Sequence, residues 1–157
     1  MNTAVQAVGV SSSTQLHPLD AIFEEVDPNN RDFGLQRFVY NKILHAGVAT
    51  SIGSPVGDLA ASGGGTVTPD ISDTVAGNIL GDGGGFSTIA VAAGTTAYGW
   101  VQSRGKNRYA AKCTGAVAAS AHCVWTDDNT FAAFTDPGNE ELIFGIALVA
   151  AASGLIA

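Results

Sequence analysis

The chain has 157 residues, which is enough for one domain with a core of its own. Charged residues make up only 13% of it, against about 25% in a typical soluble protein, which excludes a fold built from long Glu-, Lys- and Arg-rich helices. The formal net charge of −7 argues against direct binding to nucleic acid, because that affinity rests mainly on Lys and Arg side chains that neutralise phosphates.

Residues 1–34 are predicted to form an extended N-terminal arm, in which the His17-Pro18 dipeptide favours extended backbone geometry. Residues 19–26 are an exception, since their apolar residues have the spacing of one helical face and predict two helical turns. These apolar residues are Leu19, Ile22, Phe23 and Val26. Two interpretations of this apolar face stay open: it packs on the chain's own domain, or it reaches a neighbouring subunit.

Residues 35–157 read as short β-strands separated by Gly, Asp and Asn turns. Residues 36–44, the first of these strands, are rich in aromatic and β-branched side chains. Two runs of three glycines then bracket short candidate strands at residues 66–68 and 78–80. No lysine follows either run, as a phosphate-binding loop requires, so we interpret both as turns or as places where two backbones approach closely.

The second half of the chain predicts a β-hairpin. Residues 98–103 form its first strand, residues 104–107 its Gly-containing turn, and residues 109–114 its return strand. Further short strands are expected at residues 86–91, 122–126, 130–134, 142–149 and 155–156. Many short strands with such turns indicate an all-β fold, a small β-barrel or sandwich that carries the extended N-terminal arm.

The sequence contains no constellation of residues for catalysis. His122 and Cys123 are neighbours on a predicted strand, so their side chains point to opposite faces and do not form a Cys–His pair. Adjacent acidic residues such as Asp127 and Asp128 are expected in solvated turns, and the residue spacing of a calcium-binding loop is missing around them. We therefore expect no enzyme activity, no catalytic residue, no cofactor and no metal site.

The two cysteines, Cys113 and Cys123, are too few for a disulfide scaffold or a zinc site. We predict two buried free thiols, although facing strands of a hairpin would bring them together, so a bond between them stays open. Residues 1–13 lack the pattern of a signal peptide, and the apolar residues 142–157 are too short to span a bilayer. We expect a soluble protein that is made in the cytoplasm and has no membrane partner.

Basic residues are concentrated in one place. Four of the seven lie within nine residues that contain no acid: Arg104, Lys106, Arg108 and Lys112. Two interpretations stay open, a solvated face of the predicted hairpin and a contact with an acidic patch on a protein partner. Trp100 and Trp125 are expected in the core, and the alternative for them is a stacking site for a sugar or base.

One segment carries a resemblance to a known family. Residues 93–105, AGTTAYGWVQSRG, resemble a strand and turn of the capsid cement, or head decoration, proteins of tailed bacteriophages. Residues 115–125 and 144–151 are similar to later strands of that family, and residues 36–40 match an early strand more weakly. The resemblance extends over residues 36–157, but neither the arm nor the glycine-interrupted middle of the chain matches that family.

The resemblance implies a non-enzymatic protein on the outside of the virion, assembled in the cytoplasm of a bacterial host. There it is expected to bind the major capsid protein, to associate with itself as a homotrimer, and to stabilise the shell. Six residues are the candidates for partner binding: Leu19, Ile22, Phe23, Arg104, Lys106 and Arg108. The alternatives are a phage tail or fibre component, a carbohydrate-binding module that uses Tyr98, Trp100 or Trp125, and a small hydrolase that uses His122 or Asp128.

Overall fold

The computed structural model describes residues 6–26, 31, 34–44, 47–59, 64–69, 84–106, 113–125, 131–135 and 143–152. Every regular element in these ranges is a β-strand, which confirms the prediction of an all-β fold. The strands are β1 (Ile22–Val26), β2 (Leu35–Leu44), β3 (Pro55–Asp58), β4 (Thr66–Thr68), β5 (Gly85–Ser87), β6 (Thr96–Arg104), β7 (His122–Trp125), β8 (Phe131–Ala133) and β9 (Ile143–Ile146). The same ranges contain no helix long and apolar enough to cross a membrane.

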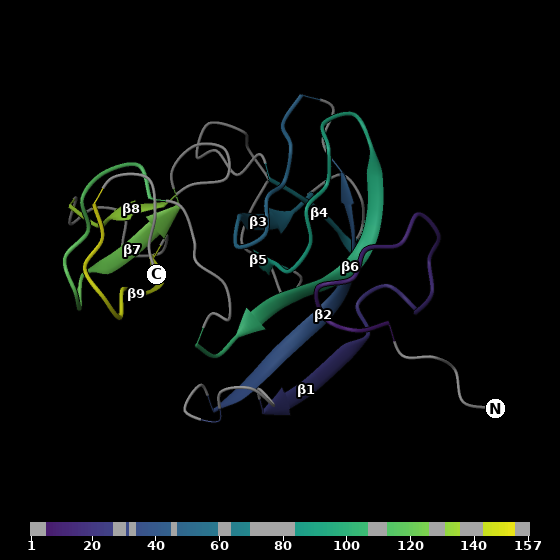
Figure 1. Ribbon diagram of the computed structural model, residues 1–157, viewed down its shortest axis with the longest axis horizontal. Helices are drawn as coiled ribbons and strands as arrows, with labels where there is room; N and C mark the ends of the chain where they lie inside the picture. The colour runs from purple at the N-terminus through teal and green to yellow at the C-terminus, as the bar shows by residue number, and fades with distance from the viewer. Residues whose placement is uncertain are drawn as a thin grey trace.

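Five of these strands close into a barrel (Figure 1). Their order is β2-β4-β3-β5-β6, and β6 pairs back onto β2. Neighbouring strands are antiparallel, except that β2 and β4 are parallel. The longest pairing is that of β2 with β6, which runs from Leu44 opposite Thr96 to Arg37 opposite Arg104. Closure satisfies the backbone hydrogen bonds of a small sheet that would otherwise expose two edges.

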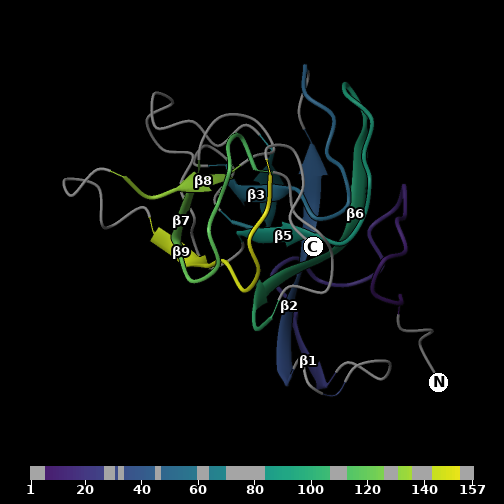
Figure 2. The ribbon, with the colours of Figure 1, turned by 60° about the vertical axis from the view of Figure 1, so that its left-hand side comes forward.

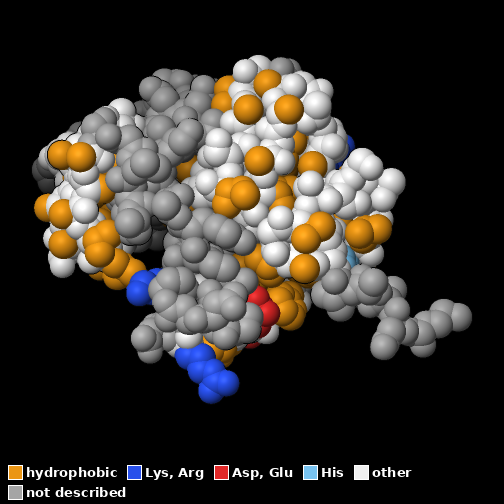
Figure 3. Space-filling view, viewed as in Figure 1, with side chains coloured by type: hydrophobic (Ala, Val, Ile, Leu, Met, Phe, Trp, Pro, Cys, Tyr) orange, Lys and Arg blue, Asp and Glu red, His pale blue; other side chains and the backbone are white. Residues whose placement is uncertain are grey.

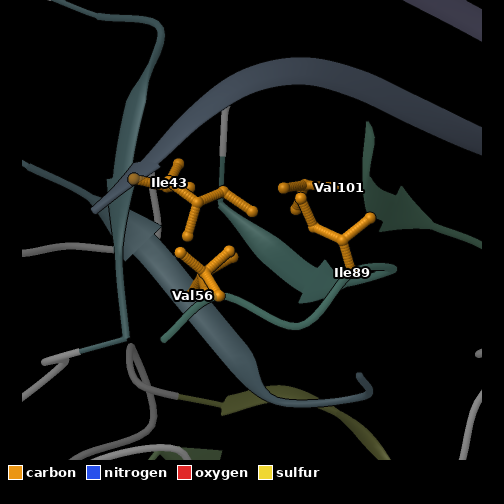
Figure 4. Close-up of a cluster of buried hydrophobic side chains, with 6 residues drawn as sticks. Ile43, Val56, Ile89 and Val101 are labelled. Carbon is orange, nitrogen blue, oxygen red and sulfur yellow. The ribbon is translucent and has the colours of Figure 1, made fainter. Parts of the chain in front are cut away.

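Apolar side chains fill the interior of the barrel. Figure 4 shows Ile43, Val56, Ile89 and Val101 pointing toward one another from different segments of the chain. All four are at most 1% exposed, and Val67 and Val91 complete the cluster. Side chains alternate between the two faces of a strand, so the neighbours of Ile43 and Val101 on β2 and β6 point out of the barrel.

A second core lies on the outer face of β2 and β6. It consists of Phe38, Tyr40 and Trp100, which are almost completely buried. The N-terminal segment covers these rings with apolar side chains that include Leu19 and Phe23. Of the two interpretations of the arm's apolar residues, the structure therefore supports packing of Leu19 and Phe23 on the chain's own domain.

The predicted helical turns at residues 19–26 are wrong, because the structure has strand β1 there. β1 is antiparallel to β2, with Phe23 opposite Phe38 and Val26 opposite Leu35. Exposure alternates along the strand, and Ile22 and Val26 point to solvent while Phe23 points to the second core. The edge of β2 supplies hydrogen-bond partners for this strand, whereas a helix of only two turns is marginal by itself. The β-branched residues Ile22 and Val26 also favour a strand.

Gln6 fastens the N-terminal segment to the barrel. Its side-chain carbonyl accepts a hydrogen bond of 2.8 Å from the Tyr40 hydroxyl, and its amide donates one of 3.1 Å to the Tyr98 carbonyl. Its backbone carbonyl accepts 2.7 Å from the indole N–H of Trp100, and its backbone N–H donates to Nε2 of His17. Gln6, which precedes all the barrel strands in the sequence, thus supplies hydrogen-bond partners for the Tyr40 hydroxyl and the Trp100 indole N–H.

The C-terminal strands form a smaller unit beside the barrel (Figure 2). β7 lies between β8 and β9, and bridges join Cys113 to Phe131 and Val117 to Ala151, so the segment 113–117 contacts both sides of this sheet. The enclosed side chains are Cys113, Val117, Cys123, Phe131 and Ala147. Phe86 on β5 packs against this cluster and connects the two units.

The predicted hairpin is wrong at the described end of its return strand, where Cys113 does not pair with β6. β6 confirms the first strand and Gly105, with a φ of +93°, forms the turn, but both edges of β6 are occupied. β2 pairs with one edge, while β5 and Ser12 pair with the other. Cys113, near the end of the expected return strand, instead bridges Phe131. Residues 107–112, like the predicted strands at 78–80 and 155–156, lie outside the described residues.

A substitution at Gly85 can test how closely β5 approaches β6 in the closed barrel. A Cβ atom at this position of β5 would overlap the backbone carbonyl of Gln102 on β6. We expect Gly85→Ala to lower the free energy of unfolding by about 1–3 kcal/mol, because rigid backbone must move. Gly145 on β9 has no atom within 4 Å of the same position, so Gly145→Ala is the matched control. Denaturant unfolding measures both variants, and equal midpoints would contradict the close approach.

Gln6 and Tyr40 allow a second test. We expect Gln6→Ala to cost about 1–3 kcal/mol of stability, because it leaves the buried Tyr40 hydroxyl without its acceptor. In a double-mutant cycle with Tyr40→Phe, the two costs are expected to be non-additive by at least about 0.5 kcal/mol. Gln15 is exposed and donates only to the His17 carbonyl, so Gln15→Ala serves as the control. Additive costs would show that the hydrogen bond does not fasten the segment.

Candidate functional site

Large apolar side chains are exposed where β1 and the start of β2 extend beyond the barrel (Figure 1). Ile22 is 57% exposed, Val26 48% and Leu35 61%. Val26 and Leu35 are opposite each other in the β1–β2 register, so their side chains lie on the same face of this two-stranded ribbon. We call these three residues the ribbon surface. Exposed apolar groups that gather on one element mark an interaction site more often than scattered ones do.

Charged residues surround the ribbon surface. Glu24 is exposed between Ile22 and Val26, and Arg37 lies opposite it on β2. Arg104 lies opposite Arg37 on β6, so the register carries the row of charges from β1 across to the end of the barrel. Figure 3 shows acidic side chains beside hydrophobic ones over the region where Figure 1 places β1.

The turn after β6 holds the predicted basic residues at this same end. Arg104 and Lys106 are exposed. The Lys106 backbone carbonyl accepts hydrogen bonds of 2.8 Å from the side-chain amides of both Gln36 and Gln102, which are buried. These two amides fix the backbone of the turn while the basic side chains point to solvent. Arg108 lies outside the described residues.

The candidate partner-binding residues of the N-terminal segment separate into two groups. Ile22 belongs to the ribbon surface, whereas Leu19 and Phe23 pack against the second core. Val26 and Leu35 were not among the candidates, although they complete the surface. The sequence IFEEV does not identify them, because its apolar and acidic residues do not alternate; the strand geometry puts Ile22 and Val26 on one face, and the register puts Leu35 opposite Val26.

The chain was also compared with known proteins. No protein-family model, no curated protein and no solved structure matches it.

A second exposed apolar group follows β9. It consists of Ile146, Leu148 and Val149, of which Ile146 ends the strand. The adjacent Ala147 points inward and donates its backbone N–H to the Ala121 carbonyl, so the segment is held to the smaller unit while its apolar neighbours face solvent. We call these three residues the C-terminal patch.

The side chains considered for catalysis and for sugar binding are differently placed. His122 is exposed and Cys123 is buried, so they do point to opposite sides, as predicted. Trp100 is 3% exposed and its ring lies 5.1 Å from that of Tyr40, which confirms the core placement and leaves no face for a sugar. The structure does not describe the side chain of Trp125. No group of three or more His, Cys, Asp or Glu in the described ranges is placed to hold a metal ion.

Both cysteines are free and buried in the core of the smaller unit, which confirms the prediction of two buried thiols. Burial raises the pKa of the Cys123 thiol, a backbone hydrogen bond with Ala147 lowers it by a smaller amount, and the nearby Cys113 raises it further. The native state thus holds this proton more tightly than the unfolded chain. The resulting stabilisation is present below the ordinary thiol pKa and is lost as the pH rises through the raised value.

The thiols are therefore expected to be unreactive in the folded protein. At pH 8, a disulfide reagent such as Ellman's should modify both cysteines within minutes in denaturant and neither over the same time without it, because both side chains are buried in the folded protein and out of the reagent's reach. The release of the coloured thiol measures the number modified. Cys113→Ala separates the two sites, and a native Cys123 that reacts at the denatured rate would contradict the burial.

Proposed function

We propose that the chain is a non-enzymatic structural protein of a bacteriophage virion, a cement protein that binds the outer surface of the capsid through the major capsid protein. The observation that carries the proposal is the resemblance of residues 93–105 to that family. In the structure most of this segment is β6, the strand that pairs with both β2 and β5. The resembling residues are thus the centre of the fold and not an isolated surface motif.

The surface supports a role in assembly. The chain has few charges, and the ribbon surface and the C-terminal patch expose six large apolar side chains at two separate places. A capsid-bound protein that also associates with itself needs two such surfaces. We assign the ribbon surface, with Arg104 and Lys106 beside it, to the major capsid protein, and the C-terminal patch to contacts between copies in a homotrimer. Many copies on one shell act together, so each contact need not be tight alone.

A barrel suits the mechanical demand of this role. The five strands are closed, with a filled interior and a second core outside β2 and β6, so unfolding β2 or β6 breaks contacts on both faces of the strand. Assembly in the cytoplasm of the bacterial host and a final position on the capsid exterior are parts of the same proposal.

Two measurements test the proposal. Light scattering of the purified protein is expected to show a defined oligomer, and sedimentation with expanded heads that were prepared without the protein is expected to bring it into the pellet. Bound heads should then resist heating better than bare heads. Heads that already carry their full complement of the protein are the control and should bind no more. A monomer that stays in the supernatant would reject the role, and filaments formed without heads would favour a tail or fibre component.

A further inference from the structure

The start of β1 determines which of its backbone groups face away from the barrel. Asp20 has a φ of +63°, its N–H donates 2.9 Å to the Tyr40 carbonyl, and the Tyr40 N–H donates 2.9 Å to the Ala21 carbonyl. Asp20 and Ala21 thus both lie opposite Tyr40, an arrangement known as a β-bulge. Because hydrogen-bonded pairs alternate along an antiparallel ladder, Phe23 and Glu25 are the next residues to bond with β2.

Ile22, Glu24 and Val26 therefore direct their N–H and C=O groups away from β2. β1 is the terminal strand of the larger sheet, and within the described ranges it pairs with β2 alone. The same three residues have exposed side chains. One edge of the ribbon thus presents both backbone hydrogen-bonding groups and alternating side chains, which are the two features by which an added strand is recognised.

We propose that the outer edge of β1 accepts an extended segment of a partner protein that carries Lys or Arg opposite Glu24, with an apolar residue two positions away on either side. An added strand places alternate side chains beside Ile22, Glu24 and Val26, at the distance where cross-strand pairs interact. Apolar residues extend the ribbon surface that Leu35 continues on β2, and the basic residue neutralises Glu24. The inference rests on the proposed function only for the identity of the partner.

A second copy of β1 is a poor occupant of this edge. Two copies that pair antiparallel in full register put Glu24 opposite Glu24, and like charges directly opposite each other destabilise a sheet. A slip of two residues puts each Glu24 opposite Ile22 or Val26 of the other copy, so that the added strand brings no positive charge to the carboxylate beyond Arg37 of its own chain. Glu24 thus protects the edge from pairing with another copy of β1, as charges on edge strands commonly do. The same carboxylate favours a basic residue in the partner segment.

Short peptides test the proposal on the intact protein. The capped peptide TVTKTVT places Val, Lys and Val on one face, and TVTETVT differs only in its central charge. We expect the lysine peptide to bind about threefold to tenfold more tightly, with amide NMR shifts centred on Ile22, Glu24 and Val26. The variant Glu24→Lys should reverse the order of the two peptides. A lysine peptide whose backbone nitrogens on the docking edge are methylated is the control and should not bind.

The outcomes separate this inference from the capsid role. Shifts confined to other strands, an order of the peptides that is the same in Glu24→Lys, or no binding at millimolar peptide would each overturn strand docking. If the peptides behave as expected but phage heads bind no protein, the docking edge stands and the cement role fails. If heads bind the protein and Glu24→Lys changes neither head binding nor peptide order, the cement role stands and this edge is not the contact.

Discussion

The pairing of β2 with β6 is the interaction on which the other parts of the molecule depend. It closes the barrel, and it carries a core on each of its faces, with Ile43 and Val101 inside and Tyr40 and Trp100 outside. A sheet that is buried on both faces cannot alternate apolar with polar residues, which explains why these two strands have few charges along their central parts. The outer core needs a cover of its own, and the N-terminal segment supplies it through Gln6, Leu19 and Phe23.

This cover also positions the candidate interaction surface. The segment crosses the outer core, reverses at the bulge of Asp20 and Ala21, and continues as β1 along the same edge of β2 that β4 occupies farther on. The bulge fixes the register of β1 against β2, and in this register Phe23 faces the core while Ile22 and Val26 face solvent. The position of the ribbon surface therefore follows from the way the N-terminal segment covers the second core. Its side chains are exposed because β1 and the start of β2 extend beyond the barrel.

Much of the fold follows from local sequence patterns. The β-branched and aromatic residues of β2, the short strand β4 after its glycine run and the strands β6 to β9 were predictable, because strand propensity and turn residues agree there. Residues 19–26 were not, since their apolar residues have a helical spacing without strand alternation, and the available edge of β2 is what makes residues 22–26 a strand. The pairing of Cys113 with β6 was mispredicted because a turn residue does not reveal that both edges of β6 are already paired. Among the site residues, Ile22, Arg104 and Lys106 were predictable from type, but Leu35 gains its role from the register with Val26.

The hydrogen bond from the Trp100 indole to the Gln6 carbonyl joins residues 94 positions apart. During synthesis the N-terminal segment leaves the ribosome long before β6 exists, so Gln6 has no Trp100 side chain to bind until nearly two thirds of the chain has been made. Among the barrel pairings, that of β2 with β6 joins the residues farthest apart in the sequence, and distant pairings form slowly. The hydrogen bonds of Gln6 consequently depend on the pairing of β6 with β2, because their partners Tyr98 and Trp100 belong to β6.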